Sequence, residues 1–430
     1  MKKLLRYILR VLAKRIVGKY RPFVIGITGS VGKTSTKEAI FAVLKNHYRV
    51  RKNAENYNNE IGVPLAIIDE KTGGKSFIQW LKIFSKALNI IGDKPESFPA
   101  MLVLEYGADK MGDIEYLMKV AMCDIGVLTA VTPSHLEFFG SLENVFEEKS
   151  KIVTKLTNAH ISVLNGDDPK IRALKEKTSA RVLTYGFLAG NDFQAVDVKV
   201  SHEQDKSGMR FKLKYDGKTV PVFLPVLGRP QISSCLAAIA LSSVFNIPIF
   251  DALADLQNYQ APPGRTNLLS GIKNCRLIDD SYNSSPASCL AALEILSEIG
   301  VLSGAKRVAV LGDMLELGSY TEQGHRQVGE QAARSGVDLL VAVGERSRDI
   351  LRGAVAAGLP EEKTVHFDNN YDAGIFVQEK IHSGDLILIK GSQGARMEQI
   401  VKELMAQPLR AKELLVRQSD FWLKSVISNR

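Results

Sequence analysis

The stretch FVIGITGSVGKTSTKEAIFAVLKN at residues 23–46 decides the fold of this chain. FVIGITG is a short apolar run that ends in glycine, which predicts a buried strand, and the residues after Lys33 follow a helical pattern. The loop between them holds Gly29 and Gly32, where the backbone can approach a phosphate closely. In such a loop Lys33 reaches the β and γ phosphates and Thr34 holds Mg²⁺. Strand, loop and helix in this order predict a nucleotide-binding site.

The loop departs from the standard GxxxxGK[ST] phosphate-binding motif, because Ile27 occupies the position of the first glycine. A chance glycine-rich turn is the alternative interpretation, but GKTS at a strand-to-helix junction favours nucleotide binding. The residues predicted to contact the nucleotide phosphates are Gly29, Ser30, Val31, Gly32, Lys33, Thr34 and Ser35.

Further strand-like apolar runs alternate with helical stretches in the first half of the chain. The runs are AMLVLEYG (100–107), DIGVLTAV (124–131) and ISVLNGDD (161–168), and SLENVFEEKSKIVTKL (141–156) is one of the helical stretches. This alternation predicts a parallel sheet. Residues 193–227 instead alternate in the manner of antiparallel strands, and a long helix is expected over 233–245.

A loop at residues 260–264 is taken as a domain boundary. The strand-like runs after it, at 275–281, 307–313, 339–344 and 385–391, also alternate with helices. The predicted fold class is therefore α/β, with a P-loop central domain built on a parallel sheet and a C-terminal Rossmann-like α/β domain. The predicted divisions are a basic amphipathic helix at 1–21, the central ATP-binding domain at 22–261, the C-terminal domain at 262–405 and a tail helix at 406–430.

The composition is that of a globular protein with more than one domain. Of its 430 residues, 45% are hydrophobic and 24% are charged. A chain of this length is too long to fold around a single hydrophobic core. The four cysteines are scattered, with no CxxC pair, so neither a disulfide framework nor a structural metal site is expected. A cytoplasmic location fits this cysteine usage.

Positive charge is concentrated at the start of the chain. The net charge is +9, and residues 1–21 hold eight basic and no acidic residues. Apolar and basic residues recur there at helical spacing, which predicts an amphipathic helix that is neither a membrane span nor a signal peptide. Three roles are open for it: packing on its own domain, contact with a membrane surface, or binding the diphosphate of a substrate. Nucleic acid is not expected as a partner, because no aromatic-basic strand motif accompanies the charge.

Seven blocks along the chain carry the most specific pattern. They are NYNNEIGVPLAI (56–67), LEYGADKMGDI (104–114), SHLEFFGSLENVFEEKSKI (134–152), PGRTN (263–267), DDSYNSSPAS (279–288), LGDMLELG (311–318) and KGSQGARME (390–398). The shortened loop TGxxGKT resembles that of the Mur ligases and their folylpolyglutamate synthetase relatives. The seven blocks resemble, within the Mur ligases, the branch that adds D-alanyl-D-alanine to a cell-wall precursor.

The resemblance implies an ATP-dependent ligase that joins a carboxylate to an amine through an acyl phosphate. Its substrates would be UDP-N-acetylmuramoyl-tripeptide and D-alanyl-D-alanine, its cofactors ATP and two Mg²⁺ ions, and its state a monomer. Two alternatives stay open: a Mur-like ligase for another carboxylate acceptor, and a catalytically silent nucleotide-binding scaffold on the membrane.

The metal ligands are predicted partly from the sequence pattern and partly from the family resemblance. Glu105 ends an apolar strand, where the acidic residue of a P-loop site reaches Mg²⁺ beside Thr34. The resemblance implies that His135 and a carbamylated Lys149 hold a second Mg²⁺. Lys151 is the rival of Lys149. With Lys33, the residues Glu105, His135 and Lys149 form the expected catalytic set.

The resemblance also assigns the remaining ligand contacts. It implies that Arg265 contacts the phosphates and Asp280 the ribose, while Gln231 and Ser234 replace asparagines that contact adenine in the family. The residues expected at the substrates are Asn56, Asn58, Asn59, Tyr282, Asn283, Lys390, Ser392 and Arg396, with Glu398 as a further candidate.

The front of the chain departs from the family pattern. Family members of this branch carry a separate domain that holds the UDP-sugar ahead of the phosphate loop, whereas only about 25 residues precede the loop in this sequence. The uridine site is therefore expected to be missing or rebuilt. An apparent insertion at 71–99 is either a compensating element or a decoration of the central domain.

Overall fold

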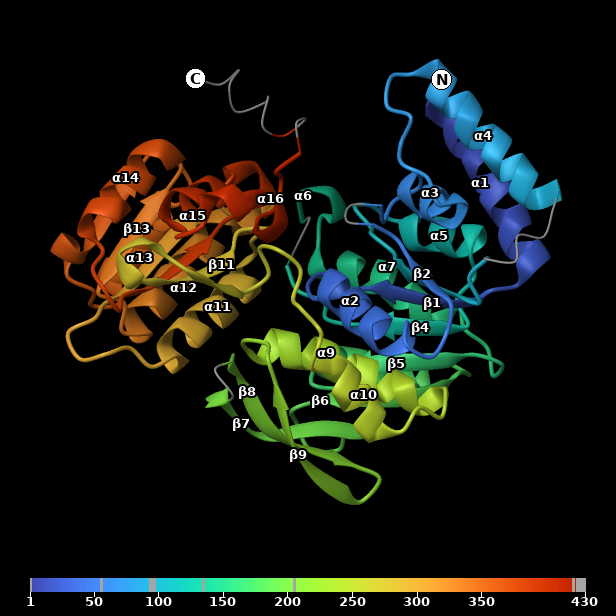
Figure 1. Ribbon diagram of the computed structural model, residues 1–430, viewed down its shortest axis with the longest axis horizontal. Helices are drawn as coiled ribbons and strands as arrows, with labels where there is room; N and C mark the ends of the chain where they lie inside the picture. Colours follow the sequence, from blue (N-terminus) through green and yellow to red (C-terminus); the bar gives the residue numbers. More distant parts are fainter. Residues whose placement is uncertain are drawn as a thin grey trace.

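The computed structural model describes residues 2–54, 57–92, 98–133, 136–203, 206–419 and 422. Within these residues the chain builds two sheets, each covered by helices on both faces. Figure 1 shows the first half of the chain, blue to yellow-green, on the right and along the bottom, and the second half, gold to red, on the upper left. The predicted α/β class is confirmed, and the two sheets fall on either side of the loop at 260–264.

The sheet of the first half has nine described strands in the order β2-β3-β1-β4-β5-β6-β7-β8-β9. Neighbours from β2 to β7 pair in parallel, and β7, β8 and β9 pair antiparallel, which confirms the antiparallel pattern predicted for 193–227. The strands are β1 (Phe23–Thr28), β2 (Val50–Lys52), β3 (Met101–Glu105), β4 (Ile125–Leu128), β5 (Ile161–Asn165), β6 (Arg181–Gly186), β7 (Phe193–Glu203), β8 (Lys206–Tyr215) and β9 (Lys218–Leu224).

Both faces of this sheet are buried, which explains why β1 reads as an unbroken apolar run. Ile25 and Ile27 face the core under α2, α9 and α10, whereas Val24 faces the core under the other helices. The helices of this half are α1 (Lys2–Tyr20), α2 (Lys33–Leu44), α3 (Gly62–Ile68), α4 (Phe77–Gly92), α5 (Asp113–Val120), α6 (Leu136–Phe139), α7 (Leu142–Thr154), α8 (Pro169–Arg172), α9 (Arg229–Val244) and α10 (Ile249–Leu256).

The second sheet has six described strands in the order β10-β11-β15-β12-β13-β14, parallel except for the pair β10 and β11. The strands are β10 (Asn267–Ser270), β11 (Arg276–Asp280), β12 (Arg307–Gly312), β13 (Leu339–Val343), β14 (Thr364–Phe367) and β15 (Leu386–Lys390). One face is covered by α11 (Pro286–Glu298), α12 (Thr321–Arg334) and α13 (Arg348–Ala356), the other by α14 (Asn370–Lys380), α15 (Glu398–Leu404) and α16 (Ala411–Leu414).

The two ends of the chain differ in how well the sequence predicts them. The N-terminal helix is confirmed as α1, which buries Leu9, Leu12 and Ile16 against the first domain. The prediction of one tail helix over 406–430 is wrong in the described part, where a short turn and the four-residue α16 lead into irregular backbone up to 419. Arg417 there has φ +57°, which is outside right-handed helical geometry, and its side chain donates to the carbonyl oxygens of Ser281 and Tyr282. No described helix is long and apolar enough to cross a membrane.

Candidate active site

A cleft of about 820 Å³ lies between the two halves of the chain. Its lining includes the phosphate loop, the loop after β3 and the start of α9 on one side, and the segments after β11 and β15 on the other. The carboxyl ends of parallel strands from both sheets therefore meet at this cleft, which is where α/β proteins bind their ligands.

The phosphate loop has the backbone that its glycines predict. Gly29 has φ +151°, and a Cβ atom there would lie 2.0 Å from the Thr129 hydroxyl, so no larger residue fits. Gly32, at φ +84°, is the residue before α2. The first turn of α2, Lys33 to Ser35, lines the cleft. The unpaired backbone N–H groups of this turn are suited to bind phosphate.

Lys33 lies over the loop that it follows. Its ammonium donates to the carbonyl oxygens of Gly29, at 2.9 Å, and Ser30, at 3.2 Å. Burial lowers the pKa of Lys33, the Glu105 carboxylate raises it, and Arg265 across the cleft lowers it again, with a net decrease. A partly buried cation between an acid and a second cation is a strong attractor for the phosphate anions of a nucleotide.

Glu105 is fixed by contacts on both of its carboxylate oxygens. The Thr34 hydroxyl and the Asn58 amide each donate to it at 2.9 Å. Burial raises the pKa of Glu105, but Lys33, Lys37 and the two hydrogen bonds lower it below its usual value. The side chain is therefore an anion at the end of β3, as predicted.

Two asparagines near Glu105 support the site. Asn53, which sequence reasoning missed, exchanges two hydrogen bonds with the backbone of Glu105 and holds the end of β3 in place. Asn59 lines the cleft and accepts from the backbone of Ile61 and Gly62, so it caps the start of α3. Asn56 lies outside the described residues.

Lys149 lies on α7 and is 1% exposed. Burial, and secondarily the charge of Lys33, lower the pKa of Lys149 to about 7. Its rival Lys151 is more exposed and forms an ion pair of 2.7 Å with Glu148. Lys149 thus differs from Lys151 in its burial and in its lowered pKa, and its carbamylation stays a prediction. His135 lies outside the described residues, and the described chain contains no group of three His, Cys, Asp or Glu side chains arranged to hold a metal.

Gln231 contacts three segments on the side of the cleft where adenine is predicted to bind. Its amide nitrogen lies 3.0 Å from the Arg265 carbonyl and 3.4 Å from the Ser35 hydroxyl, and its oxygen accepts from the Tyr259 hydroxyl. Ser234 lies close by and bonds to Thr36. The structure thus shows a linking role for Gln231, and its contact with adenine stays a prediction.

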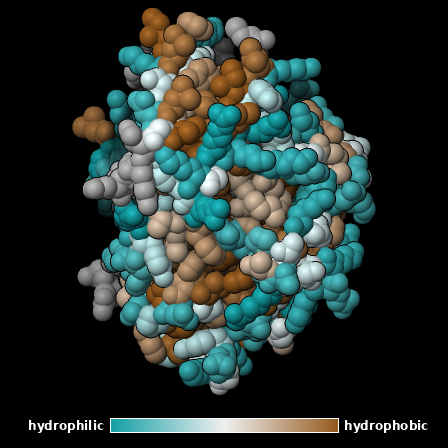
Figure 2. All heavy atoms as spheres, turned by 90° about the vertical axis from the view of Figure 1, so that its right-hand side faces the viewer, coloured by the Kyte–Doolittle hydropathy of each residue, from teal (hydrophilic) through white to brown (hydrophobic). Residues whose placement is uncertain are grey.

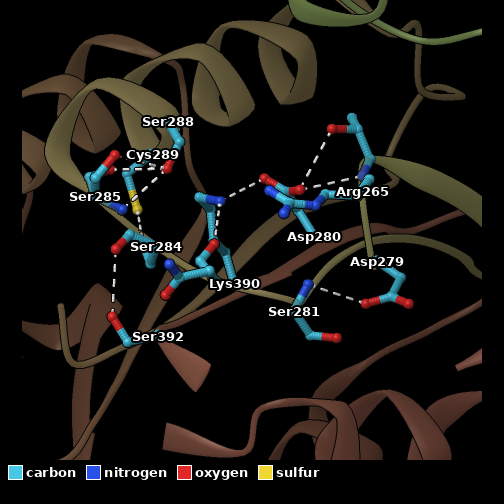
Figure 3. Close-up of polar contacts among 12 residues, drawn as sticks. Arg265, Asp279, Asp280, Ser281, Ser284, Ser285, Ser288, Cys289, Lys390 and Ser392 are labelled. Carbon is cyan, nitrogen blue, oxygen red and sulfur yellow. Dashed lines mark hydrogen bonds and ion pairs between the residues drawn. The ribbon is translucent and has the colours of Figure 1, made fainter. Parts of the chain in front are cut away.

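The second half contributes Arg265, Asp280 and Lys390 to the cleft (Figure 3). The Lys390 ammonium donates to the Asp280 carboxylate at 2.6 Å and to the Asn283 carbonyl at 3.0 Å. The Arg265 guanidinium lies over the Tyr282 ring at 4.0 Å, and its buried Nε has no hydrogen-bond partner in the described structure. Arg265 is thus positioned for an anion, whereas Asp280 already binds Lys390 and the backbone of Thr266.

A cluster of serines surrounds the start of α11, on the left of Figure 3. Ser285 and Ser288 form a capping box, and both line the cleft. The Ser392 hydroxyl donates to the Ser284 carbonyl and accepts from the Leu315 backbone. The predicted residue Ser392 therefore joins the segments after β12 and β15 to the residue that precedes the N-cap of α11.

Arg396 and Glu398 do not line the cleft, although both were candidates for substrate contact. Glu398 is buried and accepts from Arg396 at 2.6 Å and from Arg417 at 2.8 Å. Arg417 also donates to the carbonyl oxygens of Ser281 and Tyr282. Sequence reasoning missed Arg417, which ties the tail to the strand end that carries Asp280.

Comparison with known proteins identifies the family. The model of the Mur ligase middle domain matches residues 27–78 and 89–242, and that of the Mur ligase glutamate ligase domain matches 264–393. The chain belongs to the Mur ligase family. It is 33% identical over 402 residues to the UDP-N-acetylmuramoyl-tripeptide--D-alanyl-D-alanine ligase of Bacillus subtilis, covering 93% of this chain and 80% of that protein.

Two further relatives agree with this assignment. The ligase of the same name from Escherichia coli is 32% identical over 387 residues, which cover 89% of this chain and 76% of that protein. The structure of the MurF ligase from Thermotoga maritima in complex with ADP superposes with a TM-score of 0.77 at 26% identity, covering 95% of this chain and 84% of that one.

In this Mur ligase the N-terminal helix also reaches the cleft. Arg6 lines the cleft and forms an ion pair of 2.6 Å with Glu60, which precedes α3. The Arg10 guanidinium lies over the Tyr116 ring of α5. One side of α1 is thus part of the cleft wall.

Lys33→Ala should abolish ATP turnover, because the substitution removes the ammonium that neutralises charge on the transferred phosphoryl group. We expect a loss of about 100-fold or more in the rate of ADP release, with an unchanged circular dichroism spectrum. Lys45→Ala, at the exposed end of the same helix, is the matched control and should retain activity. Wild-type turnover in Lys33→Ala would contradict the site.

Arg417→Ala should destabilise the second domain, because it leaves the buried Glu398 with one fewer cation and two backbone carbonyls without their donor. We expect the free energy of unfolding in urea to fall by about 3 kcal/mol. The exposed ion pair of Arg410 gives the control, since water screens it and Arg410→Ala should leave stability nearly unchanged. Equal small effects of both substitutions would show that the tail is not tied down in this way.

Proposed function

We propose that this chain is an ATP-dependent ligase that joins D-alanyl-D-alanine to the free carboxylate of UDP-N-acetylmuramoyl-tripeptide. The observation that carries the proposal is the 33% identity with the Bacillus subtilis ligase of that specificity over nearly the whole chain. The cleft supports it, because a phosphate loop from one half faces Arg265 and Lys390 from the other.

The reaction has two steps. A carboxylate oxygen of the tripeptide acceptor attacks the γ phosphorus of ATP, the bond from that phosphorus to the bridging oxygen breaks, and ADP leaves. The amine of the dipeptide then attacks the acyl carbon, loses a proton and expels inorganic phosphate. ATP, carboxylate and amine thus give amide, ADP and phosphate.

The first half of the chain binds the phosphates and stabilises the phosphoryl group during its transfer. The N-terminal turn of α2 and the Lys33 ammonium bind the β and γ phosphates, and their positive charge offsets the charge that develops during transfer. Arg265 approaches the same anion from the second half. Both halves must close on the nucleotide, so water is kept from the acyl phosphate.

The donor atoms around Glu105 fit a divalent cation. The Thr34 hydroxyl and the Glu105 carboxylate lie 2.9 Å apart, and oxygen ligands of this kind suit Mg²⁺. When bound, Mg²⁺ neutralises phosphate oxygens. We infer that a carbamylated Lys149 and His135 hold a second ion.

The second half is expected to hold the amine substrate. Lys390 and Ser392 lie beside the serine cluster at the start of α11, and Tyr282 and Asn283 border it. Hydroxyl groups and a cation at a helix N-terminus suit the carboxylate end of a dipeptide. Asn58 and Asn59 line the opposite wall, where the acceptor carboxylate must reach the γ phosphate.

ADP release assayed with pairs of candidate substrates tests the proposed reaction. We expect turnover only when UDP-N-acetylmuramoyl-tripeptide and D-alanyl-D-alanine are both present, because the acyl phosphate is consumed only by the amine. Turnover with a different carboxylate in place of the muramoyl tripeptide would indicate another acceptor. Absence of turnover with every pair, despite ATP binding, would favour a non-catalytic scaffold.

Lys149→Ala should reduce activity by about 100-fold or more, and short-chain carboxylic acids should restore part of it. The Lys149 amine, with a pKa of about 7, adds CO₂ only when neutral and releases one proton on doing so. As the pH falls below 7 the amine becomes protonated, so wild-type activity in bicarbonate-depleted buffer should drop and added bicarbonate should recover it. Lys151→Ala is the control: it should stay active without short-chain carboxylic acids and should respond to bicarbonate as the wild type does. A fully active Lys149→Ala enzyme would contradict the assignment.

A further inference from the structure

Helices α1 and α4 expose an unusual number of large apolar side chains. Six of the fifteen exposed large apolar side chains in the described chain lie on these two helices. They are Leu4, Tyr7, Phe77, Ile78, Leu81 and Leu88, and Phe77 is 73% exposed. Figure 2 shows hydrophobic side chains gathered at the top of this face, where α1 and α4 lie. We call these six residues the apolar surface.

The geometry of α4 accounts for the exposure. Phe77, Leu81 and Leu88 follow one another at helical spacing, so they form a stripe on one face. Ile83 and Ala87, on another face, are buried next to α1. The helix therefore has two apolar faces, and packing within the chain uses only one.

Helix α4 is held firmly in this orientation. The Lys19 ammonium donates to the Ile91 carbonyl at 2.7 Å, and the Tyr20 hydroxyl donates to the Ile90 carbonyl. Near the middle of the helix, Lys86 donates to the Asp69 carbonyl at 2.7 Å and to the Glu70 carboxylate. The apolar surface is thus part of the folded domain.

Positive charge surrounds the apolar surface. Helix α1 contains seven Lys or Arg residues, residues 71–92 contain four Lys, and neither segment contains an Asp or Glu. Lys14 and Arg15 on α1 and Lys75 and Lys82 next to or on α4 are exposed. Cations around an apolar face favour an anionic bilayer, where apolar side chains enter the interface and cations meet lipid phosphates. In a symmetric dimer the same surface would meet itself, and its cations would repel one another.

We propose that α1 and α4 form a docking surface for the interface of an anionic lipid bilayer. Phe77, Leu81 and Leu88 enter the region between headgroups and acyl chains, and the lysines and arginines contact the phosphates. Because Arg6 on α1 lines the cleft, docking brings the cleft wall near the bilayer. This role is additional to ligation, which needs no membrane.

Co-sedimentation with vesicles tests the docking surface. The full-length protein should sediment with vesicles that contain phosphatidylglycerol and much less with pure phosphatidylcholine. The triple variant Phe77→Ser, Leu81→Ser and Leu88→Ser should bind the anionic vesicles at least about tenfold more weakly, since the stripe supplies the apolar contact. Lys14→Gln with Lys75→Gln and Lys82→Gln should reduce the preference for anionic vesicles and its dependence on salt.

Two controls separate docking from loss of folding. Phe250→Ser with Leu302→Ser removes exposed apolar side chains elsewhere and should leave sedimentation unchanged. All variants should retain ADP release in the absence of vesicles. In a Trp422→Phe background, Trp80 beside the stripe is the one remaining tryptophan, and its emission should shift to the blue with anionic vesicles. Equal sedimentation of wild type and stripe variant would overturn the proposal, as would a wild-type dimer that the stripe variant converts to monomer without any vesicle binding.

Discussion

The hydrogen bond from the Thr34 hydroxyl to the Glu105 carboxylate is the contact on which the site depends. It joins the first turn of α2 to the end of β3, a strand that pairs directly with β1. Thr34 can reach Glu105 only because the loop between β1 and α2 is short and its glycines allow a tight path. Asn53, Asn58 and the ammonium of Lys33 then keep this carboxylate charged and in place. The Glu105 carboxylate and the Lys33 ammonium are thus held close together at the place where the nucleotide phosphates and the metal ion are expected to bind.

The second half of the chain completes the site without a phosphate loop of its own. Its sheet ends in the ion pair of Asp280 and Lys390, and Arg265 reaches from the connecting segment towards Lys33. Gln231 links Arg265 to the start of α2, so the nucleotide region is tied to both halves. Motion of one half relative to the other would therefore alter the contacts of Arg265 first, which is the behaviour expected of a ligase that closes on ATP.

The sequence predicts those parts of the site in which short stretches decide the geometry. The phosphate loop, Glu105 at a strand end and the parallel order of strands all follow from local pattern, because a strand end and the next helix fix a loop in space. The roles of Arg417 and Asn53 could not be predicted, since each depends on a partner distant in the chain: Arg417 donates to the Ser281 carbonyl, and Asn53 bonds to the backbone of Glu105. The prediction of a tail helix was wrong for the same reason, because tertiary contacts override weak helical propensity.

Transfer of an oxygen atom tests the acyl phosphate most directly. If the acceptor carboxylate is labelled with ¹⁸O, attack on the γ phosphorus places one labelled oxygen between the acyl carbon and phosphorus, and the amine later expels it with the phosphate. Mass spectrometry of the inorganic phosphate should therefore find one ¹⁸O atom per amide formed. Unlabelled phosphate accompanied by amide formation would show that the carboxylate never attacks ATP, and would contradict the mechanism derived from this cleft.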